Sequence, residues 1–272
     1  MTTYAALLGA ITIDASNKAI RFKEGLVTQT VSLVEGVYFA RGDGAADDLH
    51  LAAKTALETN TNAVGPNTYT VSHALSINPA APAAVTSIAR ATGSSTFQIL
   101  WADALTTFKP AWLGFTAVDT AEDALTKVSS RSPSSMWISS DIPESYEPAD
   151  EYDVSVRRAR SGRVRALRRG GTYDVRTVLF RFIDSRRALS SANTADPDAT
   201  FSRFLRLNGD GKHFEFHGQT VSGTTLGALS SSTRIGTAWH FDEETASGFA
   251  PDRVERGLAL YDFDVGLMGY VS

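Results

Sequence analysis

Most of the chain alternates apolar and polar residues, which is the pattern of half-buried β-strands. Its clearest instance is residues 11–24, where this alternation runs on both sides of the turn residues Asp14 to Asn17 and predicts a hairpin. Elsewhere in the first half the pattern is interrupted by Gly, Pro and Asn. It predicts further strands within residues 27–40, 67–77, 84–91 and 95–102.

One segment of the first half changes period. Leu49, Ala53, Ala56 and Leu57 recur at helical spacing, and two aspartates precede them, where negative charge favours a helix N-terminus. We therefore predict an amphipathic helix over about residues 46–60.

The second half opens with arginine-rich strands. Turns are predicted at Ser161-Gly162 and at Gly170-Gly171, because Gly pairs and Ser-Gly pairs are typical of tight turns. These turns separate three strands, which are predicted within residues 151–160, 163–167 and 173–184.

A short helix is predicted around Phe201, Phe204 and Leu205, with Thr200 or Asp198 as its N-cap. A strand is then expected at residues 213–218. The apolar stretch near the end of the chain predicts a central pair of strands, within residues 257–271.

The region between the two halves differs in composition. Residues 117–150 are rich in Ser, Asp, Glu and Pro, with one apolar strand at 136–139, and this is typical of a linker. The fold class that follows is mainly β with a few short helices, as β-sandwich or barrel modules that each carry one helix. The predicted organisation is an N-terminal module at 1–118, a linker region at 119–150 and a C-terminal module at 151–272.

Composition narrows the classes of protein. The 272 residues are 43% hydrophobic, enough to fill the cores of one large or two ordinary domains. No apolar run approaches the roughly 20 residues that span a bilayer, and the first residues lack the basic and apolar regions of a signal peptide. We therefore expect neither membrane insertion nor secretion. The absence of cysteine excludes disulfides, thiolate nucleophiles and cysteine metal sites.

The histidines offer a weak candidate for a metal site. His213 and His217 are four residues apart, but on a strand this spacing separates them by ~13 Å. They are therefore not expected to share one metal, although His240 and Asp242 could join one of them.

Other candidates for chemistry are equally weak. The sequence contains no nucleophile elbow and no glycine-rich phosphate loop. The carboxylates of Asp47-Asp48 and Glu243-Glu244 are adjacent, so they point in different directions and favour solvation over acid–base catalysis. The tripeptide Arg41-Gly42-Asp43 resembles an adhesion motif but has little specificity. We expect no catalytic residue, metal or cofactor.

Charge is distributed unevenly. Residues 157–187 contain eleven arginines and two aspartates, a local charge of +9, so the rest of the chain carries −13 to give the net −4. Twenty arginines against six lysines also favour interfacial ion pairs, which suit the guanidinium group.

Three hypotheses account for the high density of arginines in residues 157–169. The arginines could pair with carboxylates of a neighbouring subunit, which is the favoured hypothesis. They could instead lie on solvated strand faces, or bind nucleic acid, although no aromatic residues are interleaved with them. The predicted oligomer interface comprises Arg157, Arg158, Arg160, Arg163, Arg165, Arg168 and Arg169.

The order of these segments resembles that of tailed-bacteriophage virion structural proteins. In the first half the resemblance rests on the opening hairpin, the VSLVEGVYFA strands, the DDLHLAAKTALET helix, NTYTVS, STFQILW and the closing WLGF. In the second half RTVLFRFID, TFSRFLRLNGDGKHFEFHG and YDFDVGLMGYV are similar to tail-tube and distal-tail proteins.

The resemblance implies a non-enzymatic virion protein that is assembled in the host cytoplasm. Such a protein would form trimeric or hexameric rings of the tail tube or of a distal or neck adaptor, beside other tail or neck proteins. DNA would pass through the lumen without specific binding, because an acidic lumen repels phosphates. One alternative is a capsid-associated or host-binding β module. Another is a polysaccharide-degrading tail protein, for which Asp262 and Asp264 are candidate carboxylates, although the favoured role of these two residues is to form salt bridges with the arginines.

Overall fold

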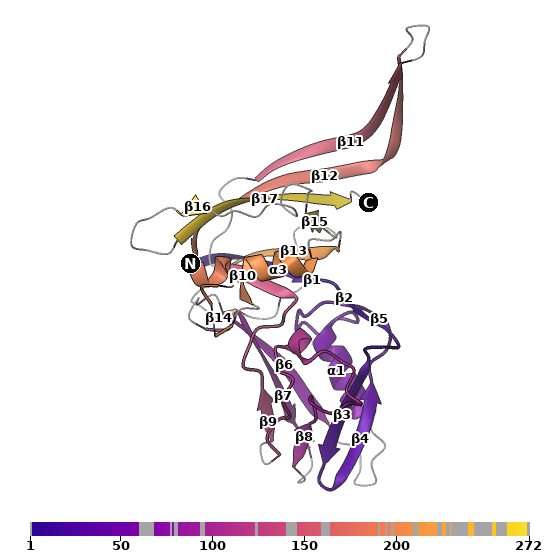
Figure 1. Cartoon of the computed structure of the whole chain (residues 1–272), viewed down its shortest axis with the longest axis vertical. Helices are drawn as coiled ribbons and strands as arrows, with labels where there is room; N and C mark the ends of the chain where they lie inside the picture. Colours follow the sequence, from indigo (N-terminus) through magenta and orange to yellow (C-terminus); the bar gives the residue numbers. More distant parts are fainter. Residues whose placement is uncertain are drawn as a thin grey trace.

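The computed structural model describes most of the chain and shows an elongated molecule (Figure 1). A large sheet forms its upper part, several small sheets form a lower body, and two long strands rise from the upper sheet as an arm. The residues described are 2–59, 68–76, 78, 81–92, 96–122, 125–139, 146–158, 164–189, 191–193, 195–196, 199–208, 212–221, 225–226, 229, 239–241, 252–253 and 260–270.

The upper sheet is antiparallel and takes strands from both ends of the chain. Its order is β10-β1-β13-β15-β17-β12-β11, and β16 pairs with β17. It therefore draws strands from all three of the ranges predicted as modules or linker. The strands are β1 (Thr2–Gly9), β10 (Met136–Ser139), β11 (Tyr146–Arg158), β12 (Val164–Asp184), β13 (Phe214–Val221), β15 (Trp239–Phe241), β16 (Asp252–Arg253) and β17 (Leu260–Tyr270).

The lower body contains three smaller sheets among the described residues. Their strand orders are β4-β3-β8, β2-β5 and β14-β6-β7-β9. The strands are β2 (Ile11–Ile13), β3 (Ala19–Glu24), β4 (Val27–Ser32), β5 (Gly36–Tyr38), β6 (Tyr69–Ser76), β7 (Ala84–Arg90), β8 (Phe97–Ile99), β9 (Thr126–Val128) and β14 (Thr225–Leu226).

The helices are short, and two of them were predicted. Helix α1 (Leu49–Glu58) lies inside the predicted range, and Asp48 caps it by accepting a hydrogen bond from the backbone N–H of His50. Helix α3 (Phe201–Asn208) begins at Phe201, directly after Thr200, one of the two predicted N-cap residues; the other, Asp198, lies outside the described residues. The second half also contains α2 (Ser185–Ala188), so it carries two helices among its described residues, whereas one was predicted.

A 3₁₀ turn, η1 (Pro110–Leu113), closes the lower body. It ends at Gly114, which has φ 77°. A Cβ atom there would lie 2.1 Å from the carbonyl oxygen of Arg131, so only glycine fits this position.

The prediction of a mainly β fold with a few short helices is confirmed. The strands of the described residues form several open sheets. The lower body and the upper sheet nevertheless each bury an extensive apolar core.

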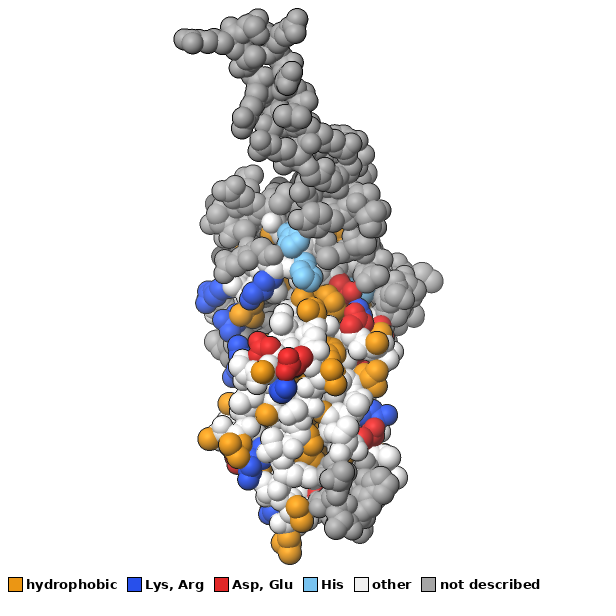
Figure 2. Space-filling model, turned by 90° about the vertical axis from the view of Figure 1, so that its right-hand side faces the viewer, with side chains coloured by type: hydrophobic (Ala, Val, Ile, Leu, Met, Phe, Trp, Pro, Cys, Tyr) orange, Lys and Arg blue, Asp and Glu red, His pale blue; other side chains and the backbone are white. Residues whose placement is uncertain are grey.

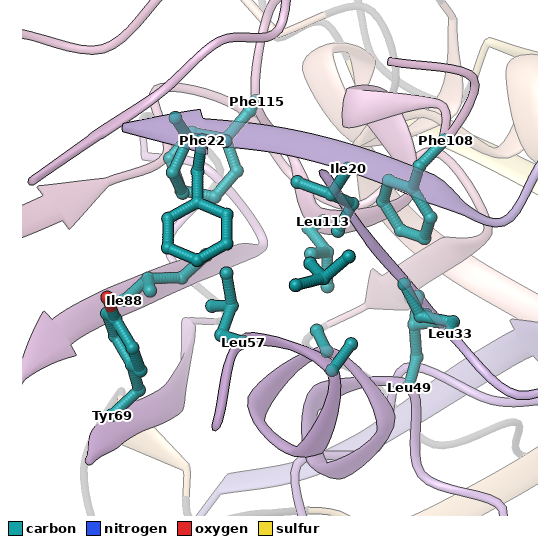
Figure 3. Packing of buried hydrophobic residues seen from close by; sticks show 14 of the residues in the cluster. Ile20, Phe22, Leu33, Leu49, Leu57, Tyr69, Ile88, Phe108, Leu113 and Phe115 are labelled. Carbon is teal, nitrogen blue, oxygen red and sulfur yellow. The ribbon is translucent and has the colours of Figure 1, made fainter. Parts of the chain in front are cut away.

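Helix α1 closes the core of the lower body. Figure 3 shows Leu49 and Leu57 of this helix pointing toward Ile20 and Phe22 of β3. Phe22 has no exposed surface, and burying each such side chain contributes about 1.5–3 kcal/mol. Because these leucines must face the core, they recur at helical spacing in the sequence, and this spacing correctly predicted α1.

Strand β1 is buried on both faces and so joins two further cores. Ala5 and Leu7 pack on one side with Trp137, Phe201 and their neighbours. Ala6 and Leu8 pack on the other side, in a cluster that includes residues of the lower body such as Phe39 and Leu75. The second cluster therefore forms the junction between the upper sheet and the lower body. Strand β1 was not predicted from the sequence, because a strand buried on both faces is uniformly apolar and does not alternate.

The predicted hairpin over residues 11–24 is wrong in its pairing. Asp14 to Asn17 do form a turn, in which the N–H of Asn17 donates to the carbonyl of Asp14. However, β2 pairs with β5, and β3 pairs with β4 and β8. The turn therefore directs the chain from one small sheet to another.

Two predictions for the second half also need correction. Gly170-Gly171 makes no turn, since β12 runs through it without interruption. Tyr152 pairs with Thr172 and Val154 with Arg168, so three residues of β12 oppose one of β11 in a bulge that contains both glycines. At the end of the chain, β17 is one central strand, where a pair was predicted.

Candidate functional site

The arginines of the predicted interface fall on the arm formed by β11 and β12. In its backbone register Arg157 pairs directly with Arg165, and Arg158 with Val164. Like charges directly opposite each other destabilise an antiparallel pair. Arg157 and Arg158 end β11, Arg165, Arg168 and Arg169 belong to β12, and Arg160 and Arg163 lie outside the described residues together with the predicted Ser161-Gly162 turn.

The outer part of the arm lacks support from the rest of the described chain. β12 pairs with β17 only from Tyr173 to Asp184, and β11 is an edge strand of the sheet. The part of β12 that precedes Tyr173 therefore forms, with β11, a two-stranded ribbon. This ribbon extends away from the upper sheet in Figure 1. An isolated two-stranded ribbon is at best marginally stable in water, and an edge strand presents unpaired N–H and C=O groups.

A second group of charged residues lies buried where the lower body meets the upper sheet. Nη1 of Arg41 donates to Oε1 of Glu215 on β13 at 2.8 Å and to Oε2 at 3.0 Å. Nε of Arg41 lies 3.3 Å from Oδ2 of Asp43, and Nη2 contacts Asp47. Arg41 is 4% exposed and Glu215 is 3% exposed. The pair therefore links the two parts of the molecule across a buried junction.

The electrostatics of this junction favour charged Arg41. Burial alone would lower its pKa, but Glu215, Asp43 and Asp47 outweigh burial and raise the pKa of Arg41. The tripeptide Arg41-Gly42-Asp43 is therefore part of an internal ion-pair network and is not displayed as an adhesion loop.

Asp48 organises the loop before α1. The N–H groups of Gly42 and Gly44 both donate to its carboxylate at 3.0 Å. Burial would raise the pKa of Asp48, but His50 and these two N–H groups outweigh burial and hold the pKa at about 2. Gly42 has φ 73°, and a Cβ there would lie 2.7 Å from the Cβ of His73, so this loop depends on glycine.

Asp48 also begins a buried chain of polar contacts. Its Oδ1 lies 3.3 Å from Nδ1 of His50, whose Nε2 lies 3.1 Å from Oγ1 of Thr86 and 3.1 Å from Nδ1 of His73. Burial and the neighbouring His50 lower the pKa of His73 well below its ordinary value.

This network places a carboxylate, an imidazole and a hydroxyl in the order found in catalytic triads, where the imidazole activates the hydroxyl as a nucleophile. Thr86, however, has no exposed surface, and His50 and Asp48 are each 1% exposed. A substrate has no access to the hydroxyl, so the network stabilises the fold by satisfying buried polar groups.

The histidines of the second half have separate neighbours. His217 is fully buried on β13, and its Nε2 lies 3.1 Å from Oε2 of Glu215, so Glu215 contacts both His217 and Arg41. His213 precedes β13, and its ring centroid lies 5.9 Å from that of His240. Asp242, Glu243 and Glu244 lie outside the described residues.

Arg187 of α2 makes a further link between the two parts. Its Nη2 donates to the carbonyls of Ser76, Asn78 and Ala81 at 3.2, 2.8 and 3.2 Å, and its own carbonyl accepts from Trp137 Nε1 at 2.8 Å. Burial lowers the pKa of Arg187 to about 10, against the opposing effect of nearby carboxylates. Arg187 therefore fixes the segment between β6 and β7 to the upper sheet.

The carboxylates proposed for a polysaccharide-degrading site lie on β17. In the backbone register Asp262 pairs with Asp252 of β16, and Asp264 pairs with Leu179 of β12. Within the described part of the chain, no three His, Asp or Glu residues are grouped in a way that could hold a metal ion. No helix among these residues has the length and apolar character needed to span a bilayer.

Comparisons with protein-family models, curated proteins and solved structures gave no match to this chain.

Proposed function

We propose that this chain is a structural subunit of a tailed-bacteriophage virion that acts by assembly and not by catalysis. It would form trimeric or hexameric rings of the tail tube, or of a distal or neck adaptor, and so line part of the conduit for DNA. The segment order described above motivates the class of protein. The observation that carries the proposal is the arm, because its outer part has no neighbouring strand within the described chain.

Assembly supplies what a single chain lacks. In a ring of identical subunits, the edge strand β11 of one copy can continue the sheet of the next, which satisfies its open N–H and C=O groups. The added neighbour also converts a marginal two-stranded ribbon into a wider and more stable sheet.

Charge favours the same arrangement. The arm concentrates arginine, while the remainder of the chain is acidic, so two copies are electrostatically complementary. Carboxylates of a neighbouring copy would offset the repulsion between the paired positions Arg157 and Arg165. The acidic remainder would also keep DNA from adhering to the conduit.

Light scattering after size-exclusion chromatography, combined with electron microscopy of the same fractions, tests this proposal. The wild-type chain is expected to form rings or tubes that dissociate as salt increases. Arg163→Glu with Arg165→Glu should block ring formation or stacking. Lys18→Glu with Arg206→Glu is the matched control, because it reverses two charges at partly or fully exposed sites away from the arm.

The outcomes separate the alternatives. A wild-type chain that stays a stable monomer at all concentrations would contradict ring assembly and favour a capsid-associated or host-binding module. Normal rings from the arm variant would exclude the arginine contact. Salt-sensitive binding of duplex DNA that the arm variant loses would instead favour the nucleic-acid hypothesis.

A further inference from the structure

A cleft of about 490 Å³ lies between α3 and the lower body. Its walls come from distant parts of the chain, including β2, η1, the residues just before β10, α3 and the residues before β13. The volume falls within the range of roughly 300–1,000 Å³ that is typical of sites for small molecules.

The cleft is basic. Lys109, Arg203, Lys212 and His213 line it, and none of its lining residues is Asp or Glu. Lys109 and Lys212 are exposed, and Figure 2 shows Lys and Arg side chains gathered near His side chains on this side of the molecule. Nζ of Lys212 donates to the carbonyl of Leu207 at 3.0 Å, and an ammonium group has two further protons to donate.

Two other residues make this cleft more than a charged surface. Trp112 is half-buried, and its ring lies 5.3 Å from Nζ of Lys109 and packs edge-to-face on Phe108, so it forms a fixed apolar wall. Ser135 also lines the cleft and is 8% exposed, yet its buried Oγ has no hydrogen-bond partner within the described structure. An unsatisfied buried hydroxyl is costly unless a ligand or water completes it.

We propose that this cleft binds a small organic anion that presents a carboxylate or phosphate group to Lys109, Arg203 and Lys212. The apolar part of the ligand would lie against Trp112, and the hydroxyl of Ser135 would supply a directional hydrogen bond. Charge-assisted hydrogen bonds from lysine and arginine are the strongest contacts that a protein offers to such groups. The site is independent of ring assembly, because one chain contributes all of these residues.

Isothermal titration calorimetry at constant ionic strength tests the proposal with three probes, D-glucuronate, inorganic phosphate and D-glucose. We expect saturable one-to-one binding of at least one anion and no binding of glucose. The two anions distinguish a sugar acid from a phosphate ester as the source of the charge. Failure of both anions to bind, or equal binding of glucose, would overturn the proposal.

Three variants locate the binding. Lys109→Glu with Lys212→Glu should weaken binding of the anion by at least about tenfold, because two charge-assisted contacts become repulsive. Ser135→Ala should weaken it about threefold or more without changing the charge. Arg206→Glu is the matched control on α3, since Arg206 is exposed and does not line the cleft, and it should retain wild-type affinity. An equal loss with Arg206→Glu would show general charge attraction and would overturn the assigned site, whereas an unchanged unfolding midpoint in every variant excludes misfolding as the cause.

Discussion

Arginine occurs in two contrasting regions of this molecule. At the junction, Arg41 and Arg187 are 4% and 3% exposed, and their guanidinium groups donate hydrogen bonds to carboxylates or carbonyls. On the arm, Arg157, Arg165 and their neighbours lie where, among the described residues, β11 and β12 pair only with each other. The same residue type thus serves an internal contact in one region and, in our proposal, a contact between subunits in the other.

The difference has a physical basis in desolvation. A buried guanidinium group costs several kcal/mol in lost hydration, and only well-placed partners offset this cost. For Arg41 the junction supplies those partners from both parts of the chain, whereas for Arg187 burial outweighs its partners and lowers its pKa. The outer part of the arm concentrates charge and has no third strand in the described part of the chain, so its stability should depend on other copies. Substitutions should therefore affect folding at the junction and assembly at the arm.

The largest effect is expected at Arg41. Arg41→Ala should lower the free energy of unfolding by about 3–5 kcal/mol, because Glu215 would be left as a buried charge without its main cation. Urea denaturation followed by tryptophan fluorescence measures this change. Arg41→Met with Glu215→Leu removes both charges and should be less destabilised than the single variant. A loss below about 1 kcal/mol for Arg41→Ala would contradict the structural role of the pair.

Arg187→Ala should have the next largest effect. It removes three hydrogen bonds from a buried guanidinium group to backbone carbonyls, which is expected to cost about 2–3 kcal/mol in the free energy of unfolding. Arg186→Ala is the neighbouring control, because Arg186 pairs with Asp184 near the surface, where such pairs contribute about 1 kcal/mol or less. Equal losses in the two variants would argue against Arg187 as a link between the parts.

Acid should weaken the junction through Asp48 and His73. The folded-state pKa of His73 is depressed, so below about pH 6.5 the unfolded chain binds a proton that the folded chain does not, and stability falls as pH falls. The pKa of Asp48 is about 2 in the folded state against an ordinary 3.8, so its contribution of about 2 kcal/mol is present above pH 3.8 and lost toward pH 2.

Denaturation measured at a series of pH values separates the two groups. Asp48→Asn should flatten the lower part of the pH dependence, and His73→Gln the upper part. Stability that stays constant from pH 7 to pH 4 would contradict the burial of neutral His73.

The sequence predicted the elements in which apolar residues recur at one regular spacing. Helix α1 was found because Leu49 and Leu57 repeat at helical spacing, and α3 because Phe201 and Phe204 do so as well. Strand pairing was less predictable. The turn after Ile13 looks like a hairpin locally, but the pairing of β2 with β5 depends on contacts that no local pattern encodes.

The junction could not be predicted for a similar reason. Arg41 and Glu215 are far apart in the sequence, and each looks like an ordinary surface charge. One signal was present, because Arg41 directly follows the apolar run Val37 to Ala40, and a charged residue next to such a run is a candidate for burial with a partner. Without knowledge that β13 lies opposite, however, its partner could not be identified.

Substitutions on the arm should change the free energy of folding least. They should therefore contrast most clearly with substitutions at the junction. Arg165→Glu places an acidic residue opposite Arg157 in the backbone register, so the pair changes from like to opposite charge. This change should stabilise the isolated ribbon by about 0.2–1 kcal/mol and slow hydrogen exchange of its amides in the monomer. The same substitution should weaken ring assembly, because it removes a cation from the proposed contact.

Arg168→Glu is the control for the cross-strand charge pair, because residue 168 pairs with Val154, and a glutamate there faces no arginine on β11. It should weaken assembly without protecting the amides of the ribbon. Exchange rates would be compared at a concentration low enough to keep each variant monomeric, since assembly itself protects amides. If Arg165→Glu protects the ribbon and also strengthens assembly, the arm joins subunits through its backbone edge, and the arginines contribute nothing to the contact. If Arg165→Glu increases the protection of the ribbon amides but weakens assembly, the arginines serve the contact with a partner subunit and lower the stability of the ribbon in the monomer.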